Sequence, residues 1–180
     1  MLKRNIFLVS IILILGCCLH FECFKSISLN SVNNKLIDSY YAKEESNNME
    51  DSYLGILEVP SINLKRGFFS LDSSLNQVDK NIELISSCNP DNPCDFILAS
   101  HSGNSAISYF KHLDHLKLQD KAILDYEHHF YIYHLTSILN QKKNGMISLE
   151  KKPISRLVLT TCDKYNQDIQ KVYIFEKEEA

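Results

Sequence analysis

Short runs of strand-forming residues follow one another from Tyr53 almost to the C-terminus, and they constrain the fold more than any other feature. The runs are apolar or alternate between apolar and polar side chains, and turn-forming residues separate them. We expect strands at residues 55–60, 67–69, 95–100, 121–126, 129–138, 146–150, 156–161 and 171–175. One helix is expected at residues 106–116, where apolar residues recur at helical spacing. This pattern predicts an all-β barrel or sandwich.

The overall composition is that of one globular domain with an appendage. The chain has 180 residues, 44% of them hydrophobic, which is enough to build a core. The formal net charge of -3 gives no sign of a nucleic-acid partner. No pair of cysteines has CxxC spacing, so neither a structural zinc site nor any other cofactor is expected.

Two cysteines, Cys88 and Cys94, flank the turn-forming residues 89–93. We expect two free thiols beside a loop. A disulfide between them is the alternative, and it would require an oxidising compartment.

The N-terminus carries a membrane-targeting pattern. Lys3 and Arg4 precede an apolar run that extends to Phe24. This predicts an uncleaved transmembrane anchor at residues 1–24, with the rest of the chain exported, because basic flanks stay in the cytoplasm. A cleaved signal peptide and a lipoprotein signal ending at Cys17 are the alternatives. Residues 25–52 are polar and are expected to form a stalk, which leaves residues 53–180 as the folded domain.

Two residues that follow apolar strands suggest thiol chemistry. Cys162 ends the strand that starts at Arg156, and His101 follows the strand at residues 95–100. Side chains alternate along a strand, so if Leu157 and Leu159 fill the core, Cys162 points away from it. A thiolate attacks carbonyl carbon, and a histidine can protonate the leaving amine. The pair therefore predicts acyl transfer through a thioester. An inert, buried cysteine is the structural alternative.

The other histidines are poorer candidates for this chemistry. His112 and His115 are one helical turn apart and could bind a metal, but a solvated helix face is the preferred interpretation, and no metal site is expected. His128 and His129 are expected in a hairpin turn, and His134 on a strand near the surface.

The residues around Cys162 and His101 resemble the sortase family. Residues 158–162, Val-Leu-Thr-Thr-Cys, are similar to the sortase signature Thr-Leu-x-Thr-Cys, with Val158 in place of the first threonine. Residues 99–104 resemble the sortase histidine region, although Ser100 stands where a glycine is usual, and residues 54–64 resemble the first strand and turn. The resemblance spans residues 53–175 and implies a closed eight-stranded β-barrel with one or two short helices.

The resemblance also implies an activity and partners. Sortases are membrane-bound cysteine transpeptidases that cleave a C-terminal sorting signal on a surface protein. They hold the new carboxyl as a thioester and pass it to an amine on cell-wall precursor or pilin. Carried over, Cys162 is the nucleophile and His101 the general acid/base.

One departure from the family concerns a missing arginine. Sortases carry an arginine after the cysteine, on the last strand, and none follows Cys162 here. Strand alignment puts Gln170 at that position, and Lys171 is the adjacent cation. If Val172 and Ile174 face the core, Lys171 shares the outward face with Tyr173. Arg156 is too far from Cys162 to substitute, by roughly 20 Å of extended strand.

Three hypotheses for the whole protein remain at this point. The first is a sortase-type transpeptidase, the second a thiol hydrolase on the same scaffold, and the third a non-catalytic binding module tethered to the membrane.

Overall fold

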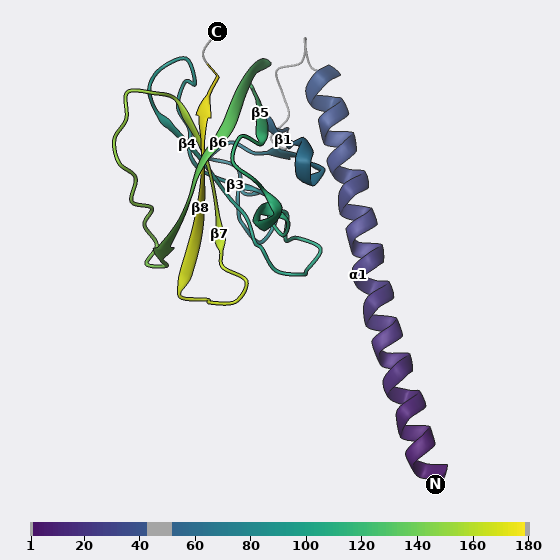
Figure 1. Cartoon of the computed structure of the whole chain (residues 1–180). Helices are drawn as coiled ribbons and strands as arrows, with labels where there is room; N and C mark the ends of the chain where they lie inside the picture. The colour runs from purple at the N-terminus through teal and green to yellow at the C-terminus, as the bar shows by residue number, and fades with distance from the viewer. Residues whose placement is uncertain (1, 43–51, 179–180) are drawn as a thin grey trace.

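The computed structural model describes residues 2–42 and 52–178, with the side chains of the first helix from Cys18 onward. A single long helix, α1 (Leu2–Ala42), lies beside a strongly curved sheet (Figure 1). The strands are β1 (Gly55–Val59), β2 (Leu64–Phe68), β3 (Glu83–Ser86), β4 (Asp95–Ala99), β5 (Lys121–Tyr126), β6 (His129–Lys142), β7 (Arg156–Cys162) and β8 (Ile169–Lys177). Two short 3₁₀ helices complete the fold, η1 (Pro60–Ile62) and η2 (Leu113–His115).

The eight strands form one sheet in the order β2-β1-β5-β6-β8-β7-β4-β3. Neighbours are antiparallel except for β4 and β7, which run parallel. The two edge strands approach each other where Phe68 forms a bridge with Ile82. The all-β prediction is confirmed, but the barrel is nearly closed rather than closed, since among the described residues this single bridge joins the two edge strands.

The core lies inside the barrel and is built from alternate residues of its strands. Leu157, Leu159, Tyr173 and Phe175 all belong to it and are at most 2% exposed. A second, smaller cluster lies on the outer face of the same strands and contains Val158, Val172 and Ile174. The premise that Val172 and Ile174 face the main core is therefore wrong, because alternation along β8 places Tyr173 there instead.

The C-terminal part of α1 packs against the barrel. Ile37 and Tyr40 are buried with Tyr53 on the barrel surface. The Tyr40 hydroxyl donates a hydrogen bond of 2.9 Å to Asp125, and Tyr53 donates one of 3.0 Å to Asn33. The helix runs without a break through the predicted boundary between anchor and stalk at residues 24 and 25. Residues 43–51 of the predicted stalk lie outside the described part of the chain, so these domain limits stay predictions.

A search of the described residues finds no helix with a stretch long and apolar enough to cross a membrane. The expected transmembrane helix at residues 1–24 is therefore not confirmed.

The predicted helix at residues 106–116 is wrong. This segment is a series of turns that ends in η2. Its backbone hydrogen bonds join residues three apart, as from Leu113 N to Phe110 O and from Leu116 N to Leu113 O. Apolar residues spaced by three fit a 3₁₀ repeat as well as an α-helix, and the 3₁₀ form buries Phe110, Leu113 and Leu116 in the core.

The predicted strand at residues 146–150 is also wrong, although its apolar side chains are used. Ile147 and Leu149 pack over the outer cluster on β7 and β8. No strand pairs with this segment in the described structure. Instead the side-chain amide of Gln141 bonds both the N–H and the carbonyl of Ser148. One glutamine thus supplies the two hydrogen bonds that a neighbouring strand would have made.

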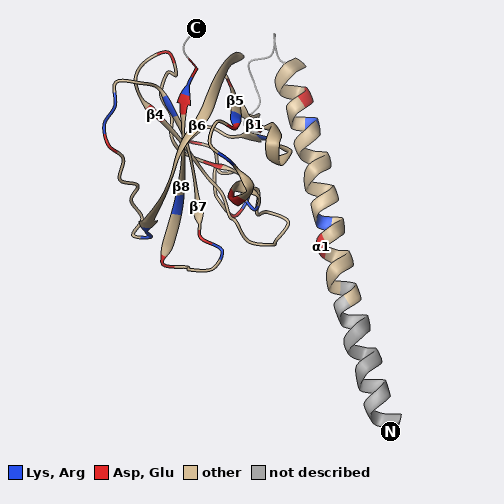
Figure 2. Cartoon of the chain, viewed as in Figure 1, with Lys and Arg blue, Asp and Glu red and all other residues tan. Residues whose placement is uncertain are grey.

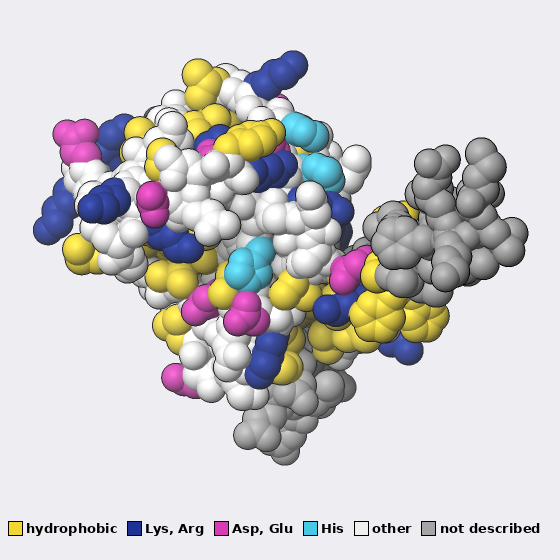
Figure 3. All heavy atoms as spheres, turned by 90° about the horizontal axis from the view of Figure 1, so that it is seen from below, with side chains coloured by type: hydrophobic (Ala, Val, Ile, Leu, Met, Phe, Trp, Pro, Cys, Tyr) yellow, Lys and Arg dark blue, Asp and Glu magenta, His cyan; other side chains and the backbone are white. Residues whose placement is uncertain are grey.

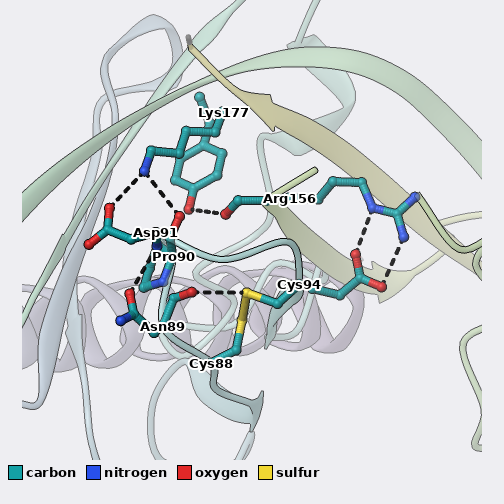
Figure 4. Close-up of a disulfide and its surroundings, with 10 residues drawn as sticks. Cys88, Asn89, Pro90, Asp91, Cys94, Arg156 and Lys177 are labelled. Carbon is teal, nitrogen blue, oxygen red and sulfur yellow. Dashed lines mark hydrogen bonds and ion pairs between the residues drawn. A yellow bond between two sulfur atoms is a disulfide. The ribbon is translucent and has the colours of Figure 1, made fainter. Parts of the chain in front are cut away.

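The expectation of free thiols at Cys88 and Cys94 is wrong, because the two, six positions apart in the sequence, form a disulfide. Figure 4 shows how the loop between them is held. Lys177 of β8 donates hydrogen bonds to the Pro90 carbonyl and to Asp91, so the turn brings the cysteines together. Hydrogen bonding by Lys177 lowers the pKa of Asp91, which keeps this contact ionic.

Candidate active site

The ends of β4 and β7 bring the two predicted catalytic residues together. These strands are parallel neighbours, with Ala99 opposite Thr160. Parallel strands end at the same edge of a sheet. His101 and Cys162 each lie two residues beyond this pair, so the prediction that a strand-end histidine meets a strand-end cysteine agrees with the topology.

Hydrogen bonds fix the backbone of one strand end to the other. Ser100 N donates to Thr160 O at 3.3 Å, and Thr161 Oγ1 donates to Ser100 O at 2.7 Å. Ser102 Oγ donates to the carbonyl of Cys162 itself. Ser102 and Thr161 are buried, so water does not compete for these bonds. The nucleophile candidate and the histidine loop are therefore held as one unit.

Cys162 is a free, half-buried thiol. The predicted alternation is confirmed, because Leu157 and Leu159 lie in the main core. A small cavity adjoins Cys162, with a volume of about 10 Å³ and walls that include Phe110, Tyr165 and Tyr173. Such a space holds about one water molecule. The cavity itself is therefore too small to hold a peptide.

His101 is held by a carboxylate that sequence reasoning did not identify. Its Nε2 lies 2.9 Å from Asp79 Oδ1, in the segment between β2 and β3. The histidine side chain is 38% exposed and the aspartate 79%. Within the described residues, no hydrogen bond joins the imidazole to Cys162 Sγ. Asp79 thus orients the ring, and His101 is not among the residues that line the cavity at Cys162.

The structure separates the two candidates for the missing cation. Gln170 is directly opposite Cys162 on β8, but its amide donates a hydrogen bond to the Met146 carbonyl. Lys171 lines the cavity with Cys162, and its Nζ lies 3.1 Å from Asp163 Oδ2. Backbone N–H groups of the next turn, with help from Lys171, lower the pKa of Asp163. Lys171 is accordingly the predicted cation that shares a cavity with the thiol.

A second lysine closes the other side of the cavity. Lys164, in the loop between β7 and β8, contacts both carboxylate oxygens of Asp114 at 2.9 and 3.0 Å. Burial raises the pKa of Asp114, but the hydrogen bond and charge of Lys164 outweigh that effect, and the net shift is downward. Figure 2 shows charges of both signs in this loop. Lys164 follows Cys162 by two residues, a proximity that a sequence search could have used.

The remaining residues considered from the sequence lie elsewhere. Arg156 is 3% exposed and pairs with Asp95 through two hydrogen bonds. His112 and His115 have ring centroids 5.3 Å apart, but no cluster of metal-ligating side chains occurs among the residues that the structure describes. As predicted, His128 lies in the turn between β5 and β6 and His134 lies on β6, whereas His129, also expected in the turn, is the first residue of β6.

A family model for the sortase domain matches residues 57–179 of this chain. A comparison with curated proteins finds no match. Among solved structures, a Clostridium perfringens sortase D5 transpeptidase has a TM-score of 0.64 at 14% identity, covering 83% of this chain and 99% of that one.

Two further structures have the same fold. A Clostridium perfringens sortase C with a C-terminal cell wall sorting motif has a TM-score of 0.61 at 21% identity and covers 88% of this chain and 90% of that one. Streptococcus pneumoniae sortase C has a TM-score of 0.60 at 17% identity, and the match covers 78% of this chain and 77% of that one. The sequence identities are low, so these structures show a shared fold only. The assignment to a family rests on the family-model match to residues 57–179. The chain belongs to the sortase family.

Proposed function

We propose that this chain is a cysteine transpeptidase that cleaves a C-terminal sorting signal and transfers the new carboxyl to an amine of cell wall or pilin. The observation that carries the proposal is the parallel pairing of β4 and β7, which sets His101 beside Cys162 on a sortase domain. A sortase domain in which the cysteine lay away from the histidine loop would not support this activity. Here the thiol is free and adjoins a cavity.

In the first half-reaction, the Cys162 thiolate attacks the carbonyl carbon of the scissile peptide bond. The carbonyl oxygen becomes an oxyanion, and the tetrahedral intermediate then expels the amine. His101 donates the proton that the leaving amine needs, and the acyl group stays on Sγ as a thioester.

In the second half-reaction, an acceptor amine attacks the thioester carbonyl. His101 takes a proton from the attacking nitrogen, and collapse of the intermediate releases the thiolate. The product is a new amide bond, so the free energy of the original peptide bond is conserved. Water in place of the amine gives hydrolysis, which is the competing outcome.

The oxyanion requires a donor, and we propose Lys171 for this role. It lines the cavity with Cys162 and is paired there with Asp163, whereas Gln170 does not line that cavity and its amide is engaged with the Met146 carbonyl. Losing one such donor costs about 2.7–4 kcal/mol, so Lys171→Ala is expected to slow acylation by about 10²-fold or more. Single-turnover acylation of Cys162, followed by mass spectrometry, measures this rate.

Gln170→Ala is the matched comparison for this prediction, because it truncates the neighbouring residue on the same strand. It should change the rate much less, and Lys171→Arg should preserve most of it. Equal rates for the two alanine variants and the unaltered chain would mean that backbone amides or other groups bind the oxyanion.

The cavity at Cys162 has room for about one water molecule, so most of a bound peptide must lie outside it. The Lys164–Asp114 pair is half-exposed, and pairs of this kind contribute at most about 1 kcal/mol. This pair therefore adds little to the cost of moving the loop between β7 and β8.

Transpeptidation and hydrolysis are separated by an amine competition. The full chain is incubated with a sorting-signal peptide, with and without oligoglycine. A transpeptidase yields a peptide–glycine conjugate at the expense of free acid, and the conjugate fraction rises with amine concentration. Release of free acid alone, unaffected by the amine, would instead identify a thiol hydrolase.

We also propose that the protein is held at the cell membrane with its folded domain outside. Lys3, Arg4 and the apolar run that follows support this placement. A disulfide such as Cys88–Cys94 persists in oxidising compartments, which agrees with an exported domain.

A further inference from the structure

The hydrogen bond between His101 and Asp79 joins two partly exposed side chains. Their exposed fractions are 38% and 79%, and Figure 3 shows histidine and acidic side chains at the surface of the barrel. An ionised carboxylate only accepts hydrogen bonds, so Nε2 of His101 carries the hydrogen and Nδ1 is left for proton transfer. An exposed pair holds its own geometry weakly. The orientation of the ring therefore depends on what fixes the two backbone segments that carry the pair.

Arg66 of β2 is buried against both of these segments. It is 6% exposed, and its Nε donates a hydrogen bond of 2.7 Å to Oδ1 of Asn81, two residues after Asp79. Its guanidinium carbon lies 3.8 Å from the ring centroid of Tyr109, eight residues after His101. One side chain thus contacts the aspartate segment with its edge and the histidine loop with its face.

Asn81 fixes one end of the turn that contains Asp79. The backbone N–H groups of Lys80 and Asn81 both donate hydrogen bonds of 2.9 Å to the Gln77 carbonyl, which closes the turn. The side-chain amide of Asn81 donates a bond of 2.8 Å to the Gly67 carbonyl of β2, while its oxygen accepts the bond from the guanidinium. The turn is therefore attached to β2 through both ends of one buried amide.

Tyr109 lies where the histidine loop closes. The N–H of the next residue, Phe110, donates a hydrogen bond of 3.0 Å to the carbonyl of His101. The Tyr109 hydroxyl is buried and has no hydrogen-bond partner within the described structure, so its ring is the part that contacts Arg66. Guanidinium groups are attracted to the faces of aromatic rings. This contact therefore holds the loop at the point where it returns to the histidine.

Stability alone does not explain a buried arginine at this position. No carboxylate pairs with Arg66 in the described part of the chain, and its Nη1 has no hydrogen-bond partner there. Burial lowers the pKa of Arg66, as expected for a charge removed from water. Replacing a buried charge by an apolar residue of similar volume is often neutral or stabilising. What the arginine adds is two directional contacts from one rigid group, one in its plane and one on its face.

We propose that Arg66 is a positioning residue for the general acid/base, an inference that rests on the proposed transpeptidase. Through Asn81 and Tyr109 it keeps the aspartate turn and the histidine loop at a fixed separation. The imidazole of His101 then keeps the orientation in which Asp79 binds its Nε2. Arg66 does not line the cavity at the thiol, so its effect on the reaction is indirect.

The first test compares two substrates for acylation of the full chain in non-ionic detergent. Arg66→Lys keeps the charge but loses the planar face that contacts Tyr109. Acylation by a sorting-signal peptide should slow by roughly 10-fold or more, because a misoriented imidazole protonates the leaving amine poorly. Acylation by an activated ester, whose leaving group needs no such proton, should change by less than about 2-fold. A general loss of folded protein would lower both rates together and leave their ratio unchanged.

Arg156→Lys is the matched control, because Arg156 is also a buried arginine, 3% exposed, but pairs with Asp95. It should lower the midpoint of thermal unfolding at least as much as Arg66→Lys, since it weakens a buried ion pair. The ratio of peptide to ester acylation should stay at the value of the unaltered chain. An unchanged ratio in Arg66→Lys, or an equal fall in both variants, would overturn the positioning role.

Two further variants keep the test decisive if Arg66→Lys folds poorly. Tyr109→Leu removes the ring and should lower the ratio, whereas the conservative Tyr109→Phe keeps the ring and should retain most of it. In the His101→Ala background, neither Arg66→Lys nor Tyr109→Leu should slow peptide acylation further, because both act through the imidazole. A further loss that adds to that of His101→Ala contradicts the proposal.

A spectroscopic measurement separates this inference from the proposed activity. In a chain with isotope-labelled histidine, the ring signals of His101 are assigned by their absence from His101→Ala. Arg66→Lys should shift these signals, and Arg156→Lys should leave them in place. If the unaltered chain is not acylated but the signals respond to Arg66→Lys, the transpeptidase fails and Arg66 still orients the ring. Signals that do not move in Arg66→Lys refute the positioning role whatever the activity.

Discussion

Replacing Cys162 by alanine is expected to abolish thioester formation and to reduce peptide turnover by on the order of 10⁴-fold or more. Cys162 is the free thiol at the end of β7, beside the histidine loop, and it is the one cysteine among the described residues that line that cavity. Intact-protein mass spectrometry after incubation with a sorting-signal peptide should show the acyl adduct only in the unaltered chain.

Cys23→Ala is the control, because Cys23 is also a free cysteine but lies exposed on α1. It should retain full turnover and acylate normally. Normal turnover in Cys162→Ala, or an adduct that maps to Cys23, would refute the assignment of the nucleophile.

Replacing His101 by alanine is expected to reduce turnover by roughly 10²- to 10⁴-fold, the usual range for losing a general acid/base. The thiol stays in place in this variant, so slow acylation by an activated thioester or ester substrate should survive better than cleavage of a peptide bond. Comparing the two substrates isolates protonation of the leaving amine.

His134→Ala is the matched control, since its imidazole contacts Glu178 and lies apart from the site. The turnover of Asp79→Asn should lie between those of His101→Ala and His134→Ala, because the amide keeps a hydrogen bond to the ring and loses the charge. If His134→Ala is the more damaging change, His101 is not the acid/base.

The sequence was sufficient to predict the strands that carry the site. A long apolar run such as the one that ends at Cys162 is typical of a buried β-strand. The alternation of side chains along that strand then determines which of them enter the core. The strand-end positions of His101 and Cys162 suggested the pair, and the family resemblance strengthened it, whereas the parallel pairing of β4 and β7 is a long-range contact without a local signal.

Other features were missed for identifiable reasons. β3 is short, and of its four residues only Leu84 is buried, so its pattern is too weak to distinguish it from a loop. Asp79 lies in a segment without regular structure, where nothing in the local sequence indicates contact with His101. Pairing of Cys88 with Cys94 depends on a turn that Lys177 holds from the far end of the chain.

The parallel pairing of β4 and β7 has a consequence for how the chain matures. It joins residues 61 apart in sequence, as the contact between Thr161 and Ser100 shows. Closing a loop of that length costs entropy that is recovered only once the strands between have packed, so contacts of this kind form late in folding. The chain therefore brings His101 next to Cys162 only when it reaches the native topology. In a partly folded chain, Cys162 is present but lacks its general acid/base.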